Sequence, residues 1–248
     1  MRRLAVSLSK GGVGKTTTAV NLAHGLALAG AEVLLIDTDT QGQAGRALGL
    51  QPAAGLAEVL SGSLQPEAAT VQARDRLWLL AGGRSLAGAK REIDKRAFGG
   101  EKALAEVLAP LEGRYDYILL DTAPGLDTLA VNVLFYVQEV LAPVSLEVLT
   151  LQGLIDFQQN LQAVKKYHEE LCLRYVLPTF LDGRVRKSQE ILDQLQKHYG
   201  QLLCSPIRYS VRLSEAPGYG QTIFEYAPGS SGAEDYGKLV ERIRQNGR

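Results

Sequence analysis

The chain has 248 residues, of which 46% are hydrophobic and 22% are charged, and this balance is ordinary for a folded domain. It excludes an intrinsically disordered chain, because such chains combine low hydrophobicity with high net charge. The 27 Lys and Arg residues equal the 27 Asp and Glu residues in number. Any polyanion must therefore be bound by a local basic cluster, and histone-like binding through net charge is excluded.

Cysteine usage and the N-terminal segment indicate the cellular compartment. The two cysteines, Cys172 and Cys204, are too few for a disulfide framework and lack metal-ligand spacing. The basic start of the chain leads into an apolar stretch that Ser7, Ser9 and Lys10 interrupt, unlike a signal peptide. No run approaches the roughly 18 apolar residues of a membrane span. We therefore expect a cytoplasmic protein.

Short β-branched and leucine-rich runs alternate along the chain with longer segments of helical spacing. The expected strands are residues 4–8, 33–36, 77–80, 117–120, 140–144, 175–180 and 202–204. The expected helices are residues 16–29, 102–108, 153–171, 188–199 and 233–244, and the stretches 41–66 and 205–232 are interpreted as loops. This order predicts one α/β domain over residues 1–248, with a doubly wound, mostly parallel sheet flanked by helices.

A glycine-rich loop follows the first expected strand and precedes the first expected helix. It reads Lys10-Gly11-Gly12-Val13-Gly14-Lys15-Thr16-Thr17. The general P-loop pattern, G-x-x-x-x-G-K-[ST], requires a glycine where this chain has Ser9, but the rest of the pattern is present. Glycines let consecutive backbone N–H groups face phosphate oxygens, and the helix N-terminus attracts anions. We expect Lys15 to reach the β- and γ-phosphates of a nucleotide and Thr16 to bind Mg²⁺.

Two carboxylates are placed to serve a bound nucleotide and its Mg²⁺. Asp121 follows the strand 117–120, at the carboxyl end where a parallel sheet binds ligands. Its alternative role is a helix N-cap. Asp39 lies just beyond the strand 33–36 and is the candidate for orienting the attacking water, whereas Asp37 is interpreted as structural or as a partner for a lysine. The expected metal site therefore comprises Thr16, Asp39 and Asp121.

The glycine-rich loop resembles the deviant Walker A motif of the ParA/MinD group of P-loop ATPases. Residues 37–43, DTDTQGQ, are close to the D-x-D-P-Q-G-N switch of ParA/Soj proteins and depart from it at the fourth and seventh positions. Residues 121–125, DTAPG, are similar to the Walker B motif and second switch. The segments VRLSEAP at 211–217 and GAEDY at 232–236 look like the C-terminal blocks of Soj-type proteins. The chain is thus identified as a member of the ParA/Soj family.

The resemblance implies an ATPase that converts ATP and water to ADP and phosphate, weakly unless a partner stimulates it. Its catalytic residues would be Lys10, Lys15 and Asp39. A second lysine in one phosphate loop adds charge repulsion unless it serves another phosphate, and in the family this lysine crosses a dimer interface to the partner's ATP. The resemblance therefore implies a homodimer in the ATP-bound state. It also assigns adenine contacts to Thr179 and Pro206, in loops after late strands.

Basic residues in the second half of the chain point to DNA. Arg184 and Arg212 match positions in the D-G-R and V-R-L-S-E-A-P segments that the resemblance assigns to contacts with backbone phosphates, and Arg186 and Lys187 lie close to Arg184. Such contacts are independent of base sequence, and nothing in the chain looks like a helix-turn-helix. The alternative is that these arginines form surface ion pairs with acidic neighbours. Those neighbours are Asp182 and Glu215.

The expected protein is a ParA/Soj-like, nucleoid-associated ATPase. It forms an ATP-sandwich dimer, binds DNA nonspecifically and segregates chromosome or plasmid DNA with a ParB-like partner. One alternative is a ParA-like positioning ATPase whose cargo is a carboxysome or a chemoreceptor cluster. The other is a MinD-like membrane-bound regulator of division. The C-terminal segment 236–248 has a small apolar set, so we expect no membrane attachment.

Overall fold

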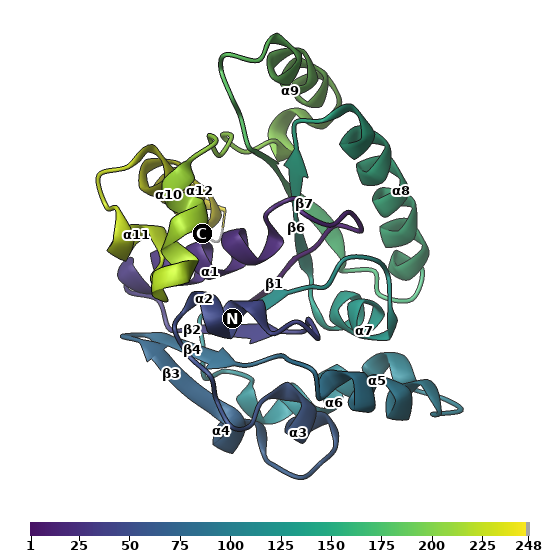
Figure 1. Cartoon of the computed structure of the whole chain (residues 1–248). Coiled ribbons are helices and arrows are strands. Elements are labelled where there is room, and N and C mark those ends of the chain that lie inside the picture. Colours follow the sequence, from purple (N-terminus) through teal and green to yellow (C-terminus); the bar gives the residue numbers. More distant parts are fainter. Residues whose placement is uncertain (247–248) are drawn as a thin grey trace.

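The structure is a computed structural model that describes residues 1–246, and its centre is a sheet with the strand order β3-β4-β2-β5-β1-β6-β7 (Figure 1). The strands are β1 (Arg2–Val6), β2 (Val33–Asp37), β3 (Thr70–Arg74), β4 (Leu77–Leu80), β5 (Tyr117–Asp121), β6 (Glu139–Ser145) and β7 (Cys172–Thr179). All neighbouring pairs are parallel except β3 and β4. This confirms the predicted doubly wound, mostly parallel architecture.

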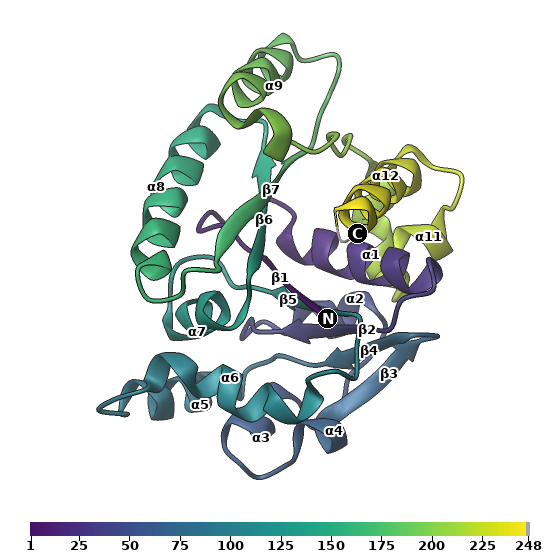
Figure 2. The same cartoon turned by 180° about the vertical axis from the view of Figure 1, so that it is seen from behind.

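Helices cover both faces of the sheet (Figures 1 and 2). One face packs against α1 (Lys15–Leu28), α2 (Gln43–Ala47), α10 (Val211–Glu215), α11 (Ile223–Tyr226) and α12 (Ser231–Gln245). The other packs against α3 (Leu56–Leu60), α4 (Pro66–Ala69), α5 (Leu86–Asp94), α6 (Ala103–Leu108), α7 (Thr128–Tyr136), α8 (Val148–Lys165) and α9 (Arg186–Tyr199). Short 3-10 turns occupy Gly100–Lys102, Ala109–Leu111, Gly200–Leu202 and Ala216–Tyr219.

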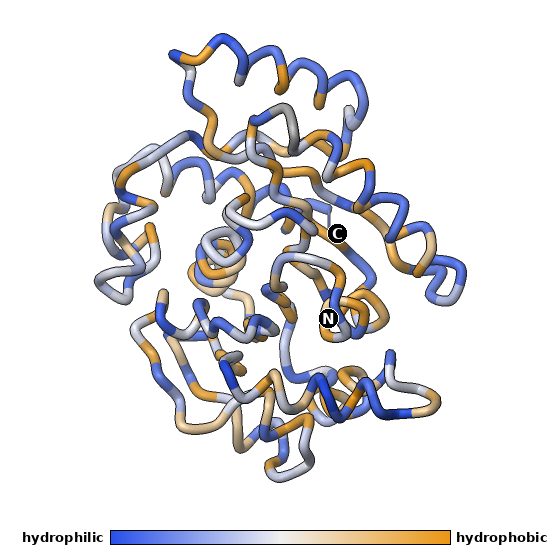
Figure 3. Tube along the Cα trace, turned by 45° about the vertical axis from the view of Figure 1, so that its right-hand side comes forward, coloured by the Kyte–Doolittle hydropathy of each residue, from blue (hydrophilic) through white to orange (hydrophobic). Residues whose placement is uncertain are grey.

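Burial on both faces explains why the strands are continuous apolar runs. In β2, Val33 and Leu35 join the core beneath α1, whereas Leu34 and Ile36 join the core of the opposite layer. α9 carries apolar residues on one side only, and Ile191 and Leu195 are its buried hydrophobic residues. In Figure 3 hydrophobic residues accordingly gather in the interior, and α9 alternates between the two classes.

Several element boundaries differ from the expectation. The predicted strand 202–204 is wrong: only Leu203 forms an isolated bridge, to Val176, and Leu202 belongs to a 3-10 turn. β1 begins and ends two residues earlier than expected: Arg2 is in register with Tyr117 of β5, and its guanidinium pairs with Glu139 of β6 over 2.6 Å. The helix expected at 153–171 is instead α8, so it begins earlier and ends earlier.

Structure also occurs where none was expected. The stretches 41–66 and 205–232 contain α2, α3, α10 and α11, and β3, α5 and α7 lie outside every predicted element. α2, α3, α10 and α11 have four or five residues each, which is too short for a periodic signal. α7 is almost wholly apolar, so it has no amphipathic pattern. Within residues 1–246, no helix is both long and apolar enough to cross a bilayer. The last two residues of the C-terminal segment assessed for membrane attachment, 247 and 248, lie outside the described part.

α1 and α12 pack closely at Gly25. A Cβ atom there would lie 2.6 Å from Val240 Cγ2 and 3.0 Å from Phe224 Cε2. We predict that Gly25→Ala lowers the free energy of unfolding by about 1–3 kcal/mol, because the overpacking outweighs alanine's higher helix propensity. The control is Gly237→Ala on α12, where nothing lies within 4 Å of the new methyl group. Urea denaturation followed by circular dichroism measures both, and equal stability of the two variants would contradict the close approach.

Candidate active site

Three neighbouring strands end at one point and supply the framework of the site. In the parallel register Val6 of β1 and Asp37 of β2 both stand opposite Asp121 of β5. The connections after these strands therefore leave the same edge of the sheet, where open parallel sheets bind their ligands. Hydrogen bonds tie the connections together: Gly125 N–H donates to Ser9 O over 2.9 Å, and the Thr38 hydroxyl donates to Asp121 O over 2.7 Å.

The glycine-rich loop has the backbone shape that brings N–H groups toward a common point. Gly12 and Gly14 have φ values of 74° and 86°, in the left-handed region where glycine avoids a steric penalty. α1 begins directly after Gly14, and no side chain caps its first turn. The first N–H groups of α1 therefore have no side-chain acceptor, and a bound anion satisfies such groups.

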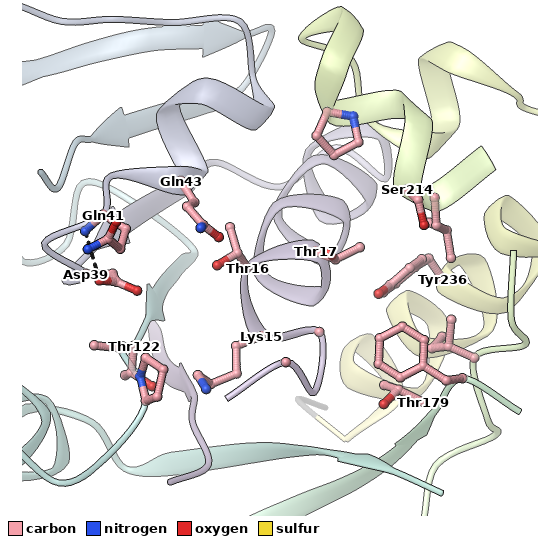
Figure 4. A pocket seen from close by; sticks show the side chains of 18 of the residues that line it. Lys15, Thr16, Thr17, Asp39, Gln41, Gln43, Thr122, Thr179, Ser214 and Tyr236 are labelled. Carbon is pink, nitrogen blue, oxygen red and sulfur yellow. Dashed lines mark hydrogen bonds between the residues drawn. The ribbon is translucent and has the colours of Figure 1, made fainter. Parts of the chain in front are cut away.

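A cavity of about 780 Å³ lies in front of this loop (Figure 4). Of the residues predicted from the sequence, its lining includes Gly12, Gly14, Lys15, Thr16, Thr17, Asp39 and Thr179. In Figure 4 Asp39, Gln41 and Thr122 lie on one side of Lys15 and Thr16, and Ser214, Tyr236 and Thr179 lie on the other. The cavity thus has a polar side beside the strand ends and a side formed by the second half of the chain.

Lys15 is buried at the base of the cavity. Only 7% of its surface is exposed, and its Nζ donates a hydrogen bond to Lys10 O over 2.8 Å. Burial lowers the pKa of Lys15, and the nearby carboxylates of Asp121 and Asp39 oppose that shift. A desolvated ammonium group is strongly attracted to an anion that enters the cavity.

Lys10 lies outside the cavity lining and is bound by its own chain. Its Nζ donates to Glu147 Oε2 and to Thr150 Oγ1, each over 2.8 Å. Glu147 precedes α8, and the Thr150 hydroxyl also lies 2.9 Å from Ser145 Oγ at the end of β6. Sequence reasoning missed Glu147 because its contact joins residues 137 positions apart.

Asp121 lies beneath the cavity and is completely buried. Neither of its carboxylate oxygens has a hydrogen-bond partner within the described chain. The nearby Thr16 hydroxyl and Lys15 ammonium favour the charged form of Asp121 but do not offset its burial. Burial raises the pKa of Asp121 well above its ordinary value, and the neighbouring carboxylate of Asp37 adds to the rise. The N-cap alternative for Asp121 is wrong, because Asp127 caps α7 by accepting the Ala130 N–H over 2.9 Å.

Asp37 and Asp39 have different environments although they are two residues apart. Asp37 is fully buried and accepts the N–H groups of Asp39 and Ala44 over 2.9 Å and 3.0 Å. Burial raises its pKa to about 6 despite these bonds, and its contacts favour the structural interpretation. Asp39 lines the cavity, and its Oδ1 accepts the Gln41 N–H over 2.9 Å.

Of the two predicted adenine contacts, one lines the cavity and the other does not. Thr179 lines it, and its hydroxyl donates to Val13 O over 3.0 Å. Pro206 lies outside the lining, which instead includes the next four residues of that loop, from Ile207 to Ser210. Sequence reasoning also missed Phe180 and Tyr236 as lining residues. Tyr236 belongs to the GAEDY segment, whose resemblance to a Soj-type block was the sequence signal that could have identified it.

The predicted DNA-binding arginines are exposed and paired. Arg184 pairs with Asp182 over 2.7 Å and Arg212 pairs with Glu215 over 3.3 Å, while their side chains stay 85% and 60% exposed. Such exposed pairs contribute little to stability. Arg186 pairs with Glu190 over 3.2 Å, and Lys187 is exposed at the start of α9. The two arginine-bearing loops meet where Leu181 and Arg208 form a β-bridge.

The two buried aspartates differ in a way that a stability measurement reveals. We predict that Asp121→Asn raises the free energy of unfolding of the ligand-free protein by about 1 kcal/mol, because it removes a buried carboxyl group whose ionisation is unfavourable and whose oxygens lack hydrogen-bond partners. Asp37→Asn, the matched control, should lower it by about 1–3 kcal/mol, since one of two backbone N–H groups loses its acceptor. Thermal unfolding in chelator measures both, and a loss for Asp121→Asn as large as for Asp37→Asn would refute the assignment.

Comparisons with known proteins place the chain among ATPases of known families. A family model described as an AAA domain matches residues 1–173. The chromosome-partitioning ATPase Soj of Thermus thermophilus is 39% identical, over 98% of this chain and 95% of that protein. The sporulation initiation inhibitor protein Soj of Bacillus subtilis is 34% identical, over 98% of both.

A solved structure extends the likeness to three dimensions. The crystal structure of cobyrinic acid a,c-diamide synthase from Mycobacterium smegmatis, with a bound ATP analogue and magnesium, has a TM-score of 0.85 at 32% identity. The match covers 100% of this chain and 97% of that one. Relatives that match along nearly the whole chain, together with the shared fold and the glycine-rich loop, lead to one conclusion. The chain belongs to the ParA/Soj family of P-loop ATPases.

Proposed function

We propose that this chain is a partition ATPase that binds ATP and Mg²⁺, dimerises around the nucleotide and binds DNA nonspecifically. It would segregate chromosome or plasmid DNA with a ParB-like partner that stimulates its weak hydrolysis. The observation that carries the proposal is the cavity at the ends of β1, β2 and β5, with Lys15 at its base and the unpartnered Asp121 beneath it. The names of the Soj relatives support the cellular role.

The phosphates of ATP would occupy the polar side of the cavity. The left-handed glycines and the uncapped start of α1 supply N–H donors, and Lys15 supplies a positive charge with little surrounding water. Lys15 Nζ now donates to a backbone carbonyl, which is a neutral acceptor. Exchanging that bond for a charge-assisted bond to a phosphate oxygen is favourable.

The residues beside the loop fit a magnesium ion held mainly by phosphate and water. Residues 1–246 contain no cluster of three His, Cys, Asp or Glu side chains able to hold a metal alone. Mg²⁺ in nucleotide sites usually takes one or two protein oxygens besides phosphate oxygens and water. Thr16 and Asp39 line the cavity, and the orphaned oxygens of Asp121 would accept hydrogen bonds from metal-bound water. The bound ion would neutralise charge on the transferred phosphoryl group.

Asp39 is the residue proposed to orient the attacking water. The Gln41 N–H holds one of its carboxylate oxygens, and only 9% of its surface is exposed. A carboxylate fixed in this way at the cavity edge can hold a water in one orientation for in-line attack on the γ-phosphate.

Lys10 is the proposed link between two subunits. To reach a partner's nucleotide it must leave Glu147 and Thr150, which bind it in the single chain. The Glu147 side chain is 69% exposed, so this ion pair is weak and its exchange for a phosphate contact is favourable. Nucleotide hydrolysis would remove the γ-phosphate contact and return Lys10 to Glu147, which makes the dimer transient.

The two lysines of one loop should separate binding from dimerisation. Lys15→Ala should weaken ATP and ADP binding at least about a hundredfold, because it removes a buried charge-assisted bond to phosphate. Lys10→Ala should keep ADP affinity within about twofold but abolish the ATP-dependent dimer. Titration calorimetry and analytical ultracentrifugation give the two readouts, each on both variants. An ATP-dependent dimer of Lys10→Ala would remove the cross-subunit role and leave nucleotide binding standing.

The DNA-binding surface would comprise the adjoining loops that carry Arg184 and Arg212, with Arg186 and Lys187 next to them. Each arginine is itself exposed and pairs with a carboxylate that is at least 26% exposed, and Arg212 also lies 6.0 Å from the centre of the Tyr226 ring. A pair on such an exposed arginine exchanges readily for a phosphate. A chain without net charge needs such local contacts to hold DNA, and a dimer duplicates each one.

Arg184→Ala combined with Arg212→Ala should abolish DNA binding while ATP-dependent dimerisation persists. Removing one arginine–phosphate bond reduces the slope of log affinity against log salt by about 0.9, equally on unrelated sequences. Arg114→Ala is a charge-matched control. This exposed arginine precedes β5 and so lies at the amino ends of the parallel strands, away from the cavity at their carboxyl ends. Fluorescence anisotropy on two unrelated duplexes across a salt series is the measurement. If the double variant and Arg114→Ala bind alike, DNA is not held by this surface.

A further inference from the structure

The last long helix, α12, contacts one wall of the cavity through Arg208, and the carboxylate of Asp235 makes most of the hydrogen bonds of that contact. Asp235 accepts the backbone N–H of Arg208 over 2.9 Å. It also accepts the Arg208 guanidinium, from Nε over 2.9 Å and from Nη2 over 2.7 Å. Asp235 thus fixes both the main chain and the side chain of a residue that lines the cavity.

Burial distinguishes this contact from the other arginine pairs of the chain. The Asp235 side chain is 4% exposed, whereas Glu234, which also accepts from Arg208, is 56% exposed. A buried carboxylate that makes several hydrogen bonds holds its partner in one geometry, and an exposed one is free to exchange with water. Glu234 is therefore a matched neighbour for which no positioning effect is expected.

The segment that Asp235 holds also pairs along its backbone with residues 178–181, and Ile207 is buried. Ile207 N–H donates to Pro178 O and Tyr209 N–H donates to Leu181 O, each over 2.9 Å, so the segment extends the edge of the sheet beyond β7. The neighbour of Asp235 on α12, Tyr236, lines the cavity as well, and its hydroxyl lies 3.2 Å from Thr18 Oγ1 of α1. α12 therefore contacts both α1, the helix that follows the glycine-rich loop, and the cavity wall formed by residues 207–210.

This wall has the composition expected of a site for a flat, weakly polar group. Its lining includes Phe180, Ile207, Leu213, Pro217 and Tyr236. Figure 4 places Tyr236 and Thr179 on the side of Lys15 away from Asp39. With the phosphates at Lys15 and the metal beside Asp39, the purine base has this side left to occupy, and mostly apolar walls with a few polar groups are typical of such sites.

We propose that Asp235 is a positioning residue for the purine base, which sets nucleotide affinity and base selectivity without touching the nucleotide. By holding Arg208 it keeps the segment 207–210 in its binding geometry before the nucleotide arrives, so that binding does not have to order it. The inference rests on the proposed function, since it needs a nucleotide in the cavity. A merely stabilising ion pair would affect every ligand of the cavity in the same way.

Calorimetric titration of three probes tests the proposal: ATP, GTP and inorganic tripolyphosphate, each with Mg²⁺. Tripolyphosphate fills the phosphate side and lacks a base. Asp235→Asn should weaken ATP binding roughly tenfold and reduce the preference for ATP over GTP, while its tripolyphosphate affinity stays within about twofold of the parent chain. Glu234→Gln should match the parent chain with all three probes.

The outcomes are distinct. The positioning role would be overturned if Asp235→Asn left the ATP affinity and the base preference unchanged. It would also be overturned if this variant bound ATP and tripolyphosphate more weakly by the same factor. Should Asp235→Asn fail to fold, Arg208→Lys takes its place, because lysine keeps the charge and lacks the guanidinium fork. It should show the same ATP-selective loss, and unchanged ATP affinity would overturn the proposal. A parent chain that binds neither ATP nor tripolyphosphate would overturn the proposed function, and this inference with it.

Discussion

A buried carboxylate without a hydrogen-bond partner is the constraint on which the site depends. Asp121 is held there by the register of β5 between β1 and β2, and burial of its oxygens is unfavourable in the ligand-free chain. Lys15 shares this dry environment, and its pKa is lowered for the same reason. A negatively charged ligand that brings a cation and water would relieve both groups at once. The burial of these two groups lowers the stability of the ligand-free chain, and ligand binding would regain part of that free energy.

The two lysines of one loop illustrate how surroundings separate identical side chains. Lys15 is buried and faces the cavity, whereas Lys10 turns to Glu147 and Thr150 at the start of α8. A buried ammonium gains much from a phosphate, but an exposed ion pair is nearly neutral in free energy. A fixed lysine and an exchangeable one would suit the proposed dimer, whose subunit contacts would change with the state of the nucleotide.

Segments from the end of the chain complete a site that begins at its start. α12 packs on α1 and contributes Tyr236 to the cavity lining, and its Asp235 holds Arg208, which lines the cavity as well. The loops with Arg184 and Arg212 leave the same region. A change in the cavity is thus next to the surface proposed for DNA, and the two are joined by short, hydrogen-bonded segments rather than by a flexible linker.

The sequence by itself determined the fold class, the phosphate loop and the acids at the strand ends. These features are local: continuous apolar runs, glycines at fixed spacing, and carboxylates directly after a strand. Tertiary structure decided the contacts between distant residues, such as Lys10 with Glu147 and Arg208 with Asp235. It also decided that Ile207, rather than the neighbouring Pro206, lines the cavity. It also decided the helices of four or five residues, because a single turn gains its stability from packing and leaves no periodic pattern in the chain.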